Sequence, residues 1–295
     1  MGRLAGEGLR LGFTSHEEDV PVLSEEPVAE RDVERARTAD LLKAHAPPDW
    51  EKRFRRDDLV DAIIDGEPLQ MFVMAADIRE STMLMKEAVR FERFAFIMDK
   101  FVTAVRRGIG SPGGWFDKFT GDGFLAYWVV QTAPEDEYNE AFVQAAGNIV
   151  HTAQSLIDFF HRRVLEDFRN NSRNLSGGVG LSMGLDAGPA YLVQIGGELT
   201  VVGPPVVGAV RMVNAATRPR EIMANIFLGE RIRAEQNGVY AGLGVTVTRE
   251  HRPTKEYPRG QEVYALTFEH ETPDEAVEPA EGERVDVRPR EGSER

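Results

Sequence analysis

The chain has 295 residues, with 49 acids against 35 lysines and arginines, and its formal net charge is −14. This acidity argues against a nucleic-acid-binding protein, because such proteins need a basic surface to displace counterions. The absence of cysteine excludes disulfides, thiolate chemistry and zinc–sulfur sites. No stretch reaches transmembrane length and no signal-peptide core follows the start, so we expect a cytoplasmic protein without membrane insertion.

The two ends of the chain are polar. We expect residues 1–29 to be a flexible N-terminus and residues 270–295 a disordered acidic tail, because neither is apolar enough to build a core. Helical spacing of apolar residues over Glu30–Ala46, and again over Asp57–Ile64, predicts an N-terminal helical arm at residues 30–66. The arm is either a brace for the rest of the fold or a dimerisation or regulatory element.

An apolar run with an acid at its end follows the arm. Leu69–Ala76 predicts a buried central strand, and Asp77 comes directly after it. Ser81 or Thr82 then caps a long helix predicted over Met83–Val105. An acid beside a helix N-terminus suits a metal ion next to a triphosphate, since free backbone N–H groups bind phosphate. The alternative is that Asp77 is only a helix cap.

A second motif lies about forty-five residues later. The segment Thr120-Gly121-Asp122-Gly123 separates two apolar strands and is a strong signal for a β-hairpin. Gly121 and Gly123 are expected to supply the positive φ angles of the turn. The turn carries an acid, Asp122, and the incoming strand carries a cation, Lys118, and a plain hairpin needs neither. Carboxylates on two adjacent strand tips can hold the two divalent cations of in-line phosphoryl chemistry.

The remainder of the chain predicts further alternating helices and strands. They are a helix over Glu140–Phe168, strands over Val179–Leu185, Ala190–Ile195 and Leu199–Val202 with a turn at Ala187-Gly188-Pro189, a helix over Val206–Ala216, a strand from Glu221, a helix around Gly229–Gln236, and strands near Val239–Val247 and Glu262–Phe268. This β-α-β-β-α-β order, with added C-terminal strands, predicts an α+β sandwich of the ferredoxin-like type.

Two motifs together carry a family resemblance. Asp-Ile-x-x-Ser-Thr at Asp77–Thr82, followed by Gly-Gly-x-x-Asp-Lys-Phe-x-Gly-Asp-Gly at Gly113–Gly123, resembles the class III nucleotide cyclases. The resemblance runs over roughly Gln70 to Phe268 and implies a ferredoxin-like catalytic domain at residues 67–269. It also implies a reaction in which the ribose 3′-OH of a nucleoside triphosphate attacks the α-phosphorus and pyrophosphate leaves.

The resemblance assigns roles to the residues around both motifs. Asp77, Asp122 and the carbonyl of Ile78 would bind two divalent cations, Mg²⁺ or Mn²⁺. The residues expected to contact the substrate are Ile78, Arg79, Ser81, Thr82, Lys118, Thr200 and Lys255. Within this set Lys118 and Thr200 fall where the family contacts the base, and Lys255 lies near its late phosphate-binding cation. For these three, a plain surface role is the alternative.

One family motif is only partly present. Its pattern, Gly-x-x-Val-Asn-x-Ala-x-Arg, aligns with Gly203–Arg211, so Arg211 would stabilise charge in the transition state. Val207 then stands where the family has the Asn that orients the ribose. A second alignment, ending at Arg218, restores the Asn but needs a seven-residue insertion, and we prefer Arg211.

The resemblance also implies a homodimer and a class of substrate. In this family the metal residues of one subunit meet the base-reading residues of the other, so a single-domain chain needs a head-to-tail homodimer. The departure at Val207, the aromatic Trp115 and Phe116, and the short arm without a sensor domain resemble the Pycsar anti-phage pyrimidine cyclases. Those make cyclic UMP or cyclic CMP for a separate effector protein. A site narrowed by aromatics favours one ring over two, and we favour UTP, then CTP. The alternatives are an adenylate cyclase and a nucleotide-binding pseudo-cyclase without turnover.

Overall fold

The computed structural model describes residues 28–48, 50–130 and 135–268. The expected acidic tail and nearly all of the expected flexible N-terminus lie outside the described residues. In chain order the elements are α1 (Val28–His45), η1 (Trp50–Lys52), α2 (Arg56–Ile64), β1 (Leu69–Arg79), α3 (Ser81–Glu87), α4 (Phe91–Gly110), β2 (Trp115–Phe119), β3 (Gly123–Val129), α5 (Glu135–Phe159), the π-helical turn η2 (Phe160–Val164), α6 (Leu165–Arg169), β4 (Gly180–Ile195), β5 (Glu198–Val202), α7 (Pro204–Ala215), β6 (Ile222–Ala224), α8 (Ile226–Glu235), η3 (Ala241–Leu243), β7 (Val245–Arg252) and β8 (Gln261–Phe268).

A mixed sheet organises the molecule. Its strand order is β2-β3-β1-β4-β6-β8-β7, and β5 pairs with the far end of β4. β1 runs antiparallel to both β3 and β4, which places it in the middle of the β2-β3-β1-β4 block. The predicted α+β fold with a β-α-β-β-α-β core is therefore confirmed, and the helical N-terminal segment is present as α1 and α2.

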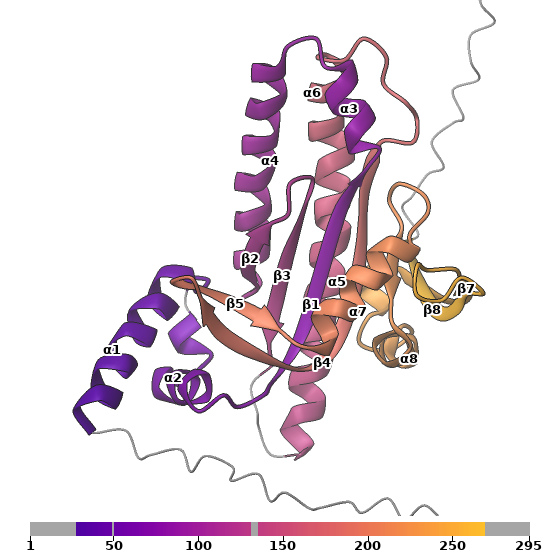
Figure 1. The fold of residues 1–295 in the computed structure, drawn as a ribbon. Coiled ribbons are helices and arrows are strands. Elements are labelled where there is room, and N and C mark those ends of the chain that lie inside the picture. The colour runs from indigo at the N-terminus through magenta and orange to yellow at the C-terminus, as the bar shows by residue number, and fades with distance from the viewer. Residues whose placement is uncertain (1–27, 49, 131–134, 269–295) are drawn as a thin grey trace, which may run out of the picture.

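Helices cover both faces of this sheet. Figure 1 shows α4 and α5 behind the central strands, with α7 in front of β1 and β4, and α1 and α2 beneath the β4–β5 ribbon. The first face is filled by a core around Phe72, Phe101 and Phe160, which are fully buried. The second face holds a separate core around Trp50 and Trp115. Since β1 is buried on both sides, its near-continuous apolar sequence is explained.

Two elements differ from the sequence-based expectation. The long helix predicted after Asp77 is interrupted between α3 and α4, where Val89 donates its backbone N–H to the carbonyl of Asn171 at 2.7 Å and Ala88 forms an isolated bridge with Ser172. The turn expected at Ala187-Gly188-Pro189 is wrong, because β4 continues through it. β4 pairs with β1 as far as Ala190, directly after these three residues, and with β5 from Tyr191 onward. Glycine and proline therefore mark a change of partner strand rather than a chain reversal.

The last predicted strand pair is also shifted at its start. Residues Ala241–Leu243 form a 3-10 turn, and β7 begins only at Val245. Within the described residues, no helix is both long enough and apolar enough to cross a bilayer.

Candidate active site

Asp77 and Asp122 lie side by side where β1 meets the β2–β3 turn. The register pairs Asp77 with Gly123, and the N–H of Ile78 donates to the backbone carbonyl of Asp122 at 3.1 Å. A Cβ on Gly123 would stand 2.0 Å from the carbonyl oxygen of Ala76, so only glycine allows this approach. The close approach of the two strands thus brings the two carboxylates to one place.

Only one of the two turn glycines has the function expected of it. Gly121 has a φ of +102°, as the hairpin motif predicts. The positive φ predicted for Gly123 is wrong, and its lack of a side chain serves the contact with β1 instead.

Ser81 positions one of the carboxylates. Its hydroxyl donates to Oδ2 of Asp122 at 2.6 Å, across the gap between α3 and the hairpin. The expectation that Ser81 or Thr82 caps the helix is wrong, since the N-cap is Glu80, in the left-handed region at a φ of +57° and without a side-chain cap hydrogen bond. The Ser81 hydroxyl is therefore committed to holding Asp122.

Arg79 balances the charge on Asp77. Its Nη2 lies 3.2 Å from Oδ2 of Asp77 and donates to the carbonyl of Val213 at 2.5 Å, in the last turn of α7. Burial raises the pKa of Asp77, Arg79 lowers it and Asp122 raises it, with a net shift upwards. Arg79 also ties β1 to α7.

The donor set at this place fits a hard divalent cation. Asp77 and Asp122 offer carboxylate oxygens, and the carbonyl of Ile78 is adjacent along the strand. In the described part of the chain no group of three or more acidic, histidine or cysteine side chains could hold a metal by itself. Mg²⁺ is commonly held by one or two carboxylates together with substrate phosphates, so two carboxylates suffice for a site that the substrate completes.

Lys118 and Thr200, the two residues expected to contact the base, lie together on the same chain. Nζ of Lys118 donates to Oγ1 of Thr200 at 2.9 Å, and it lies 3.2 Å from Oδ2 of Asp117. The Asp117 side chain is fully buried, and its other oxygen accepts from the N–H of Val201 at 3.3 Å. Asp117 stands in the Gly113–Gly123 motif but had no expected role, although an acid directly before Lys118 in an apolar strand was the available signal.

A β-bulge explains this arrangement. Phe116 pairs with Ala126 and Lys118 with Leu125, so Asp117 has no partner on β3. Such a bulge changes the direction of the side chains around it, and here both Asp117 and Lys118 reach β5.

Arg211 and Lys255 both lie next to Glu256, Arg211 through a side-chain contact and Lys255 in the sequence. Arg211 is on α7, one helical turn after Val207, and its Nε lies 3.8 Å from Oε2 of Glu256. Lys255 is exposed on the loop between β7 and β8, directly before Glu256. Arg218 lies beyond the end of α7 and its Nε is 4.0 Å from Oε1 of Glu221. Of the two arginines that the alignments offer, Arg211 therefore lies on α7 and Arg218 lies beyond its end.

The aromatic residues before Lys118 do not narrow a base-binding site together. Trp115 is 1% exposed and is stacked on Tyr127 at 5.8 Å between ring centroids, with Trp50 against its edge. Phe116 is on the other face, with the guanidinium of Arg106 4.7 Å from its centroid. The steric argument for one ring over two is wrong for Trp115, because the N-terminal arm covers it.

Comparison with solved structures identifies the fold of this chain. No protein-family model and no curated protein matches the sequence. The adenylyl cyclase CyaB from P. aeruginosa is similar in structure at a TM-score of 0.54 and 17% identity, covering 68% of this chain and 94% of that one. The guanylate cyclase domain of RhGC from Catenaria anguillulae, in complex with GTP, gives a TM-score of 0.51 at 16% identity, covering 68% and 97%. The chain has the fold of a class III nucleotide cyclase catalytic domain.

Proposed function

We propose that this protein is a class III nucleotide cyclase that converts a nucleoside triphosphate to its 3′,5′-cyclic nucleotide and pyrophosphate. The observation that carries the proposal is the pair of carboxylates, Asp77 and Asp122, brought together by β1 and the β2–β3 turn. A fold alone is compatible with many activities, whereas a pair of neighbouring carboxylates supports metal-assisted phosphoryl chemistry.

The residues have distinct tasks in this reaction. Asp77, Asp122 and the Ile78 carbonyl would hold two divalent cations, which lower the pKa of the ribose 3′-OH and neutralise the triphosphate. Ser81 keeps Asp122 in position through its hydroxyl. Arg79 links the strand of Asp77 to α7, the helix that carries Arg211.

The remaining predicted substrate contacts keep their proposed tasks. Arg211 would stabilise charge on the phosphates as pyrophosphate leaves. Arg79, Thr82, Lys255 and the backbone N–H of Ser81 are proposed phosphate contacts, and Lys118 with Thr200 the proposed base contact.

We propose a homodimer with composite sites, and the exposed face of the β4–β5 ribbon supports it. Tyr191 pairs with Val202 across the ribbon and both are exposed, on the face that also carries Thr200. On α7, Val207 and Val210 are 51% and 44% exposed. An apolar surface that contains a base-reading residue suits a second copy, because the partner would bury this surface and bring its own carboxylates to the Lys118–Thr200 pair.

For the substrate we propose a pyrimidine triphosphate, UTP before CTP, with cyclic UMP or cyclic CMP as a second messenger. The resemblance to anti-phage cyclases supports this, as does Val207 in place of a ribose-orienting Asn; an effector protein would read the product. The Lys118–Thr200 pair contains a donor and a hydroxyl and suits more than one base. Adenylate cyclase activity is the second candidate, and the adenylyl cyclase CyaB shares the fold.

A four-nucleotide assay tests the proposal. Purified protein receives ATP, GTP, CTP or UTP with Mg²⁺ or Mn²⁺, and mass spectrometry identifies the products. We expect cyclic UMP or cyclic CMP. Cyclic AMP as the main product would instead make the protein an adenylate cyclase. Nucleotide binding without any product would favour the non-catalytic pseudo-cyclase.

A further inference from the structure

A cavity of about 500 Å³ lies beside β2, next to the proposed base contact. Lys118 lines it from β2, and Glu198 lines it from the start of β5. Its opposite wall comes from the N-terminal arm, through His45 at the end of α1 and the Pro47-Pro48 pair that follows. The arm therefore borders a space that a base held by Lys118 could enter.

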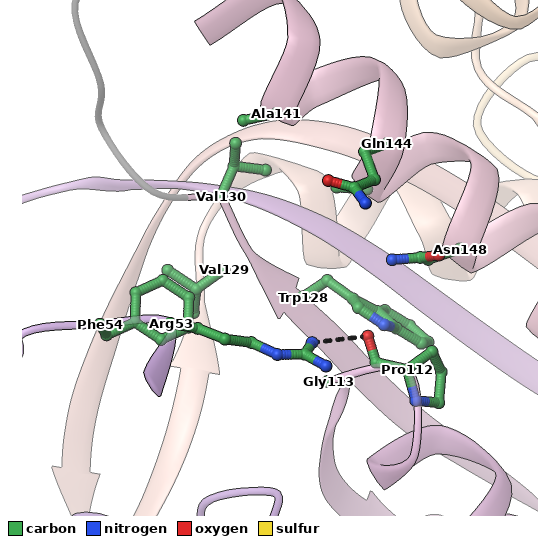
Figure 2. Close-up of a pocket in the computed structure, with 11 residues that line it drawn as sticks. Arg53, Phe54, Pro112, Gly113, Trp128, Val129, Val130, Ala141, Gln144 and Asn148 are labelled. Carbon is green, nitrogen blue, oxygen red and sulfur yellow. Dashed lines mark hydrogen bonds between the residues drawn. The ribbon is translucent and has the colours of Figure 1, made fainter. Parts of the chain in front are cut away.

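Another cavity, shown in Figure 2, suits a ligand less well. Its arginine, Arg53, already donates to the carbonyl of Pro112 at 2.8 Å. The indole nitrogen of Trp128 is covered by the protein, so a ligand there could not reach it. The cavity beside β2, called the β2 cavity below, is the better candidate.

The charges around the β2 cavity balance. Arg106 and Lys118 bring two positive charges, and Asp117 and Glu198 bring two negative charges. A triphosphate needs an excess of positive charge, whereas a nucleobase is neutral and polar. Phe119, which is 37% exposed, adds an aromatic surface to the same wall. The lining thus suits the base of a nucleotide rather than its phosphates.

Lys118 has a hydrogen-bond donor to spare. An ammonium group carries three N–H donors and no acceptor. One donor of Lys118 is used by Oγ1 of Thr200 at 2.9 Å, and another faces Oδ2 of Asp117 at 3.2 Å. The third is available to a carbonyl oxygen of a base.

His45 supplies the complementary acceptor. Its Nδ1 lies 2.9 Å from the backbone carbonyl oxygen of Leu41, and because a carbonyl only accepts, Nδ1 carries the hydrogen. In the neutral ring Nε2 is then an acceptor. The ring is only partly buried and lines the β2 cavity, and within the described residues no further hydrogen bond of this side chain is present.

We propose that His45 reads the base together with Lys118, and that this pair selects uracil. The N3–H of uracil would donate to Nε2 of His45, while the neighbouring O4 accepts from Lys118. Cytosine presents a lone pair at N3, which the lone pair of Nε2 repels. The inference rests on the proposed function, since it takes Lys118 as the base contact, and it makes the arm part of the substrate site.

The test measures binding without turnover. The 3′-deoxy analogues of UTP and CTP lack the attacking hydroxyl, and calorimetry with Mn²⁺ gives their affinities for the full chain. His45→Phe removes the acceptor and keeps a ring, and His45→Gln replaces it by an amide that donates or accepts. His151→Phe, the same substitution at an exposed position of α5, is the matched control. Urea unfolding verifies that each variant is folded.

We expect the parent and His151→Phe to bind the uridine analogue about tenfold or more tightly than the cytidine analogue, because a mismatched base leaves polar groups unpaired. His45→Phe should bring the two affinities within about threefold, mainly by weakening the uridine analogue. His45→Gln should narrow the preference too, by accepting cytosine, and it carries the test if His45→Phe does not fold.

Three results overturn the inference: neither analogue binds the parent, the parent has no preference for uracil, or the preference survives both substitutions of His45. Turnover of the parent is scored separately with the four triphosphates. Cyclic nucleotide formation without any effect of His45 would leave the cyclase function intact and remove the inference. A preference that depends on His45, without any product, would do the reverse.

Discussion

Asp117 determines how the proposed base-reading pair is held. Its buried carboxylate contacts the Lys118 ammonium and the N–H of Val201, so it fixes a flexible side chain and the adjacent strand β5 at once. A lysine that is half exposed on its own samples many rotamers, and the buried acid restricts them. Asp117 is thus a positioning residue that acts through Lys118.

Asp117→Asn should lower kcat/KM by about tenfold, because an amide oxygen still accepts from Val201 but no longer attracts the ammonium. The loss should appear mainly in KM and in the ratio between nucleotides, with kcat less affected. Steady-state kinetics with the four triphosphates measure this, and Asp40→Asn, on the exposed face of α1, is the control. An unchanged ratio between nucleotides would show that Asp117 does not position the base contact.

Asp186 makes stability depend on pH. Burial raises the pKa of this carboxyl to about 7, although the N–H of Ala187 and the amide of Asn225, both donating to it, lower the pKa. Between the ordinary value of 3.8 and about 7 the unfolded chain loses the proton and the folded chain keeps it. The free energy of unfolding should therefore fall as pH rises through this window, by on the order of 4 kcal/mol at most.

Asp186→Asn should remove this pH dependence and leave the variant relatively more stable above pH 7. Urea unfolding at pH 5 and pH 8 measures the slope, with Asp99→Asn on exposed α4 as the control. If the variant lost as much stability as the parent between the two pH values, another group would be responsible.

At the scale of elements, the contact between β4 and α7 sets the position of Arg211. Gly184 lies where the two backbones meet, and a Cβ there would stand 2.1 Å from the carbonyl oxygen of Ala209 and from the N of Val213. Since both neighbours are backbone atoms, the helix itself must move to accept a side chain.

Gly184→Ala should destabilise the protein by about 1–3 kcal/mol through this overpacking, and it should lower activity because Arg211 moves with the helix. Urea unfolding measures the first effect. Gly177→Ala provides the control, since a Cβ at Gly177 meets nothing within 4 Å and the effect should stay within about 0.5 kcal/mol. Equal free energies of unfolding for the two variants would mean that α7 moves to accept the side chain without loss of stability.

Elements were predictable from the sequence where local pattern decides them. The apolar run of β1 and the glycine turn at Gly121 specify their structures directly. The break between α3 and α4 was not predictable, because it depends on backbone bonds to Asn171 and Ser172, about eighty residues away.

The residues of the candidate site also divide into those that the local sequence predicts and those that depend on contacts between distant segments. Asp77, Asp122 and Lys118 stand in a motif and were found from it. The roles of Asp117 and Trp115 depend on a bulge and on the covering arm, and no single stretch of sequence contains that information.

At the scale of the whole molecule, the proposed dimer divides one site between two chains. A homodimer of the Asp122→Ala variant alone, or of the Lys118→Ala variant alone, should be inactive, because both chains carry the substitution and both composite sites are impaired. Mixed, they should recover up to about a quarter of the parent activity, since half of the dimers would carry one intact site of two. Mixing is followed by cyclic nucleotide production, with the dimer verified by light scattering. If mixing restored nothing although mixed dimers form, both sets of residues would act within one chain.

Metal-assisted cyclisation at Asp77 and Asp122 is tested by comparing the parent protein with a variant of each carboxylate. The parent protein, Asp77→Asn and Asp122→Asn receive the accepted triphosphate with Mn²⁺ or with excess chelator, and cyclic nucleotide and pyrophosphate are quantified together. We predict equal amounts of both products from the parent with metal, none with chelator, and a loss of about a hundredfold or more in each variant. Variants that retain the parent's rate would contradict the assignment of these carboxylates.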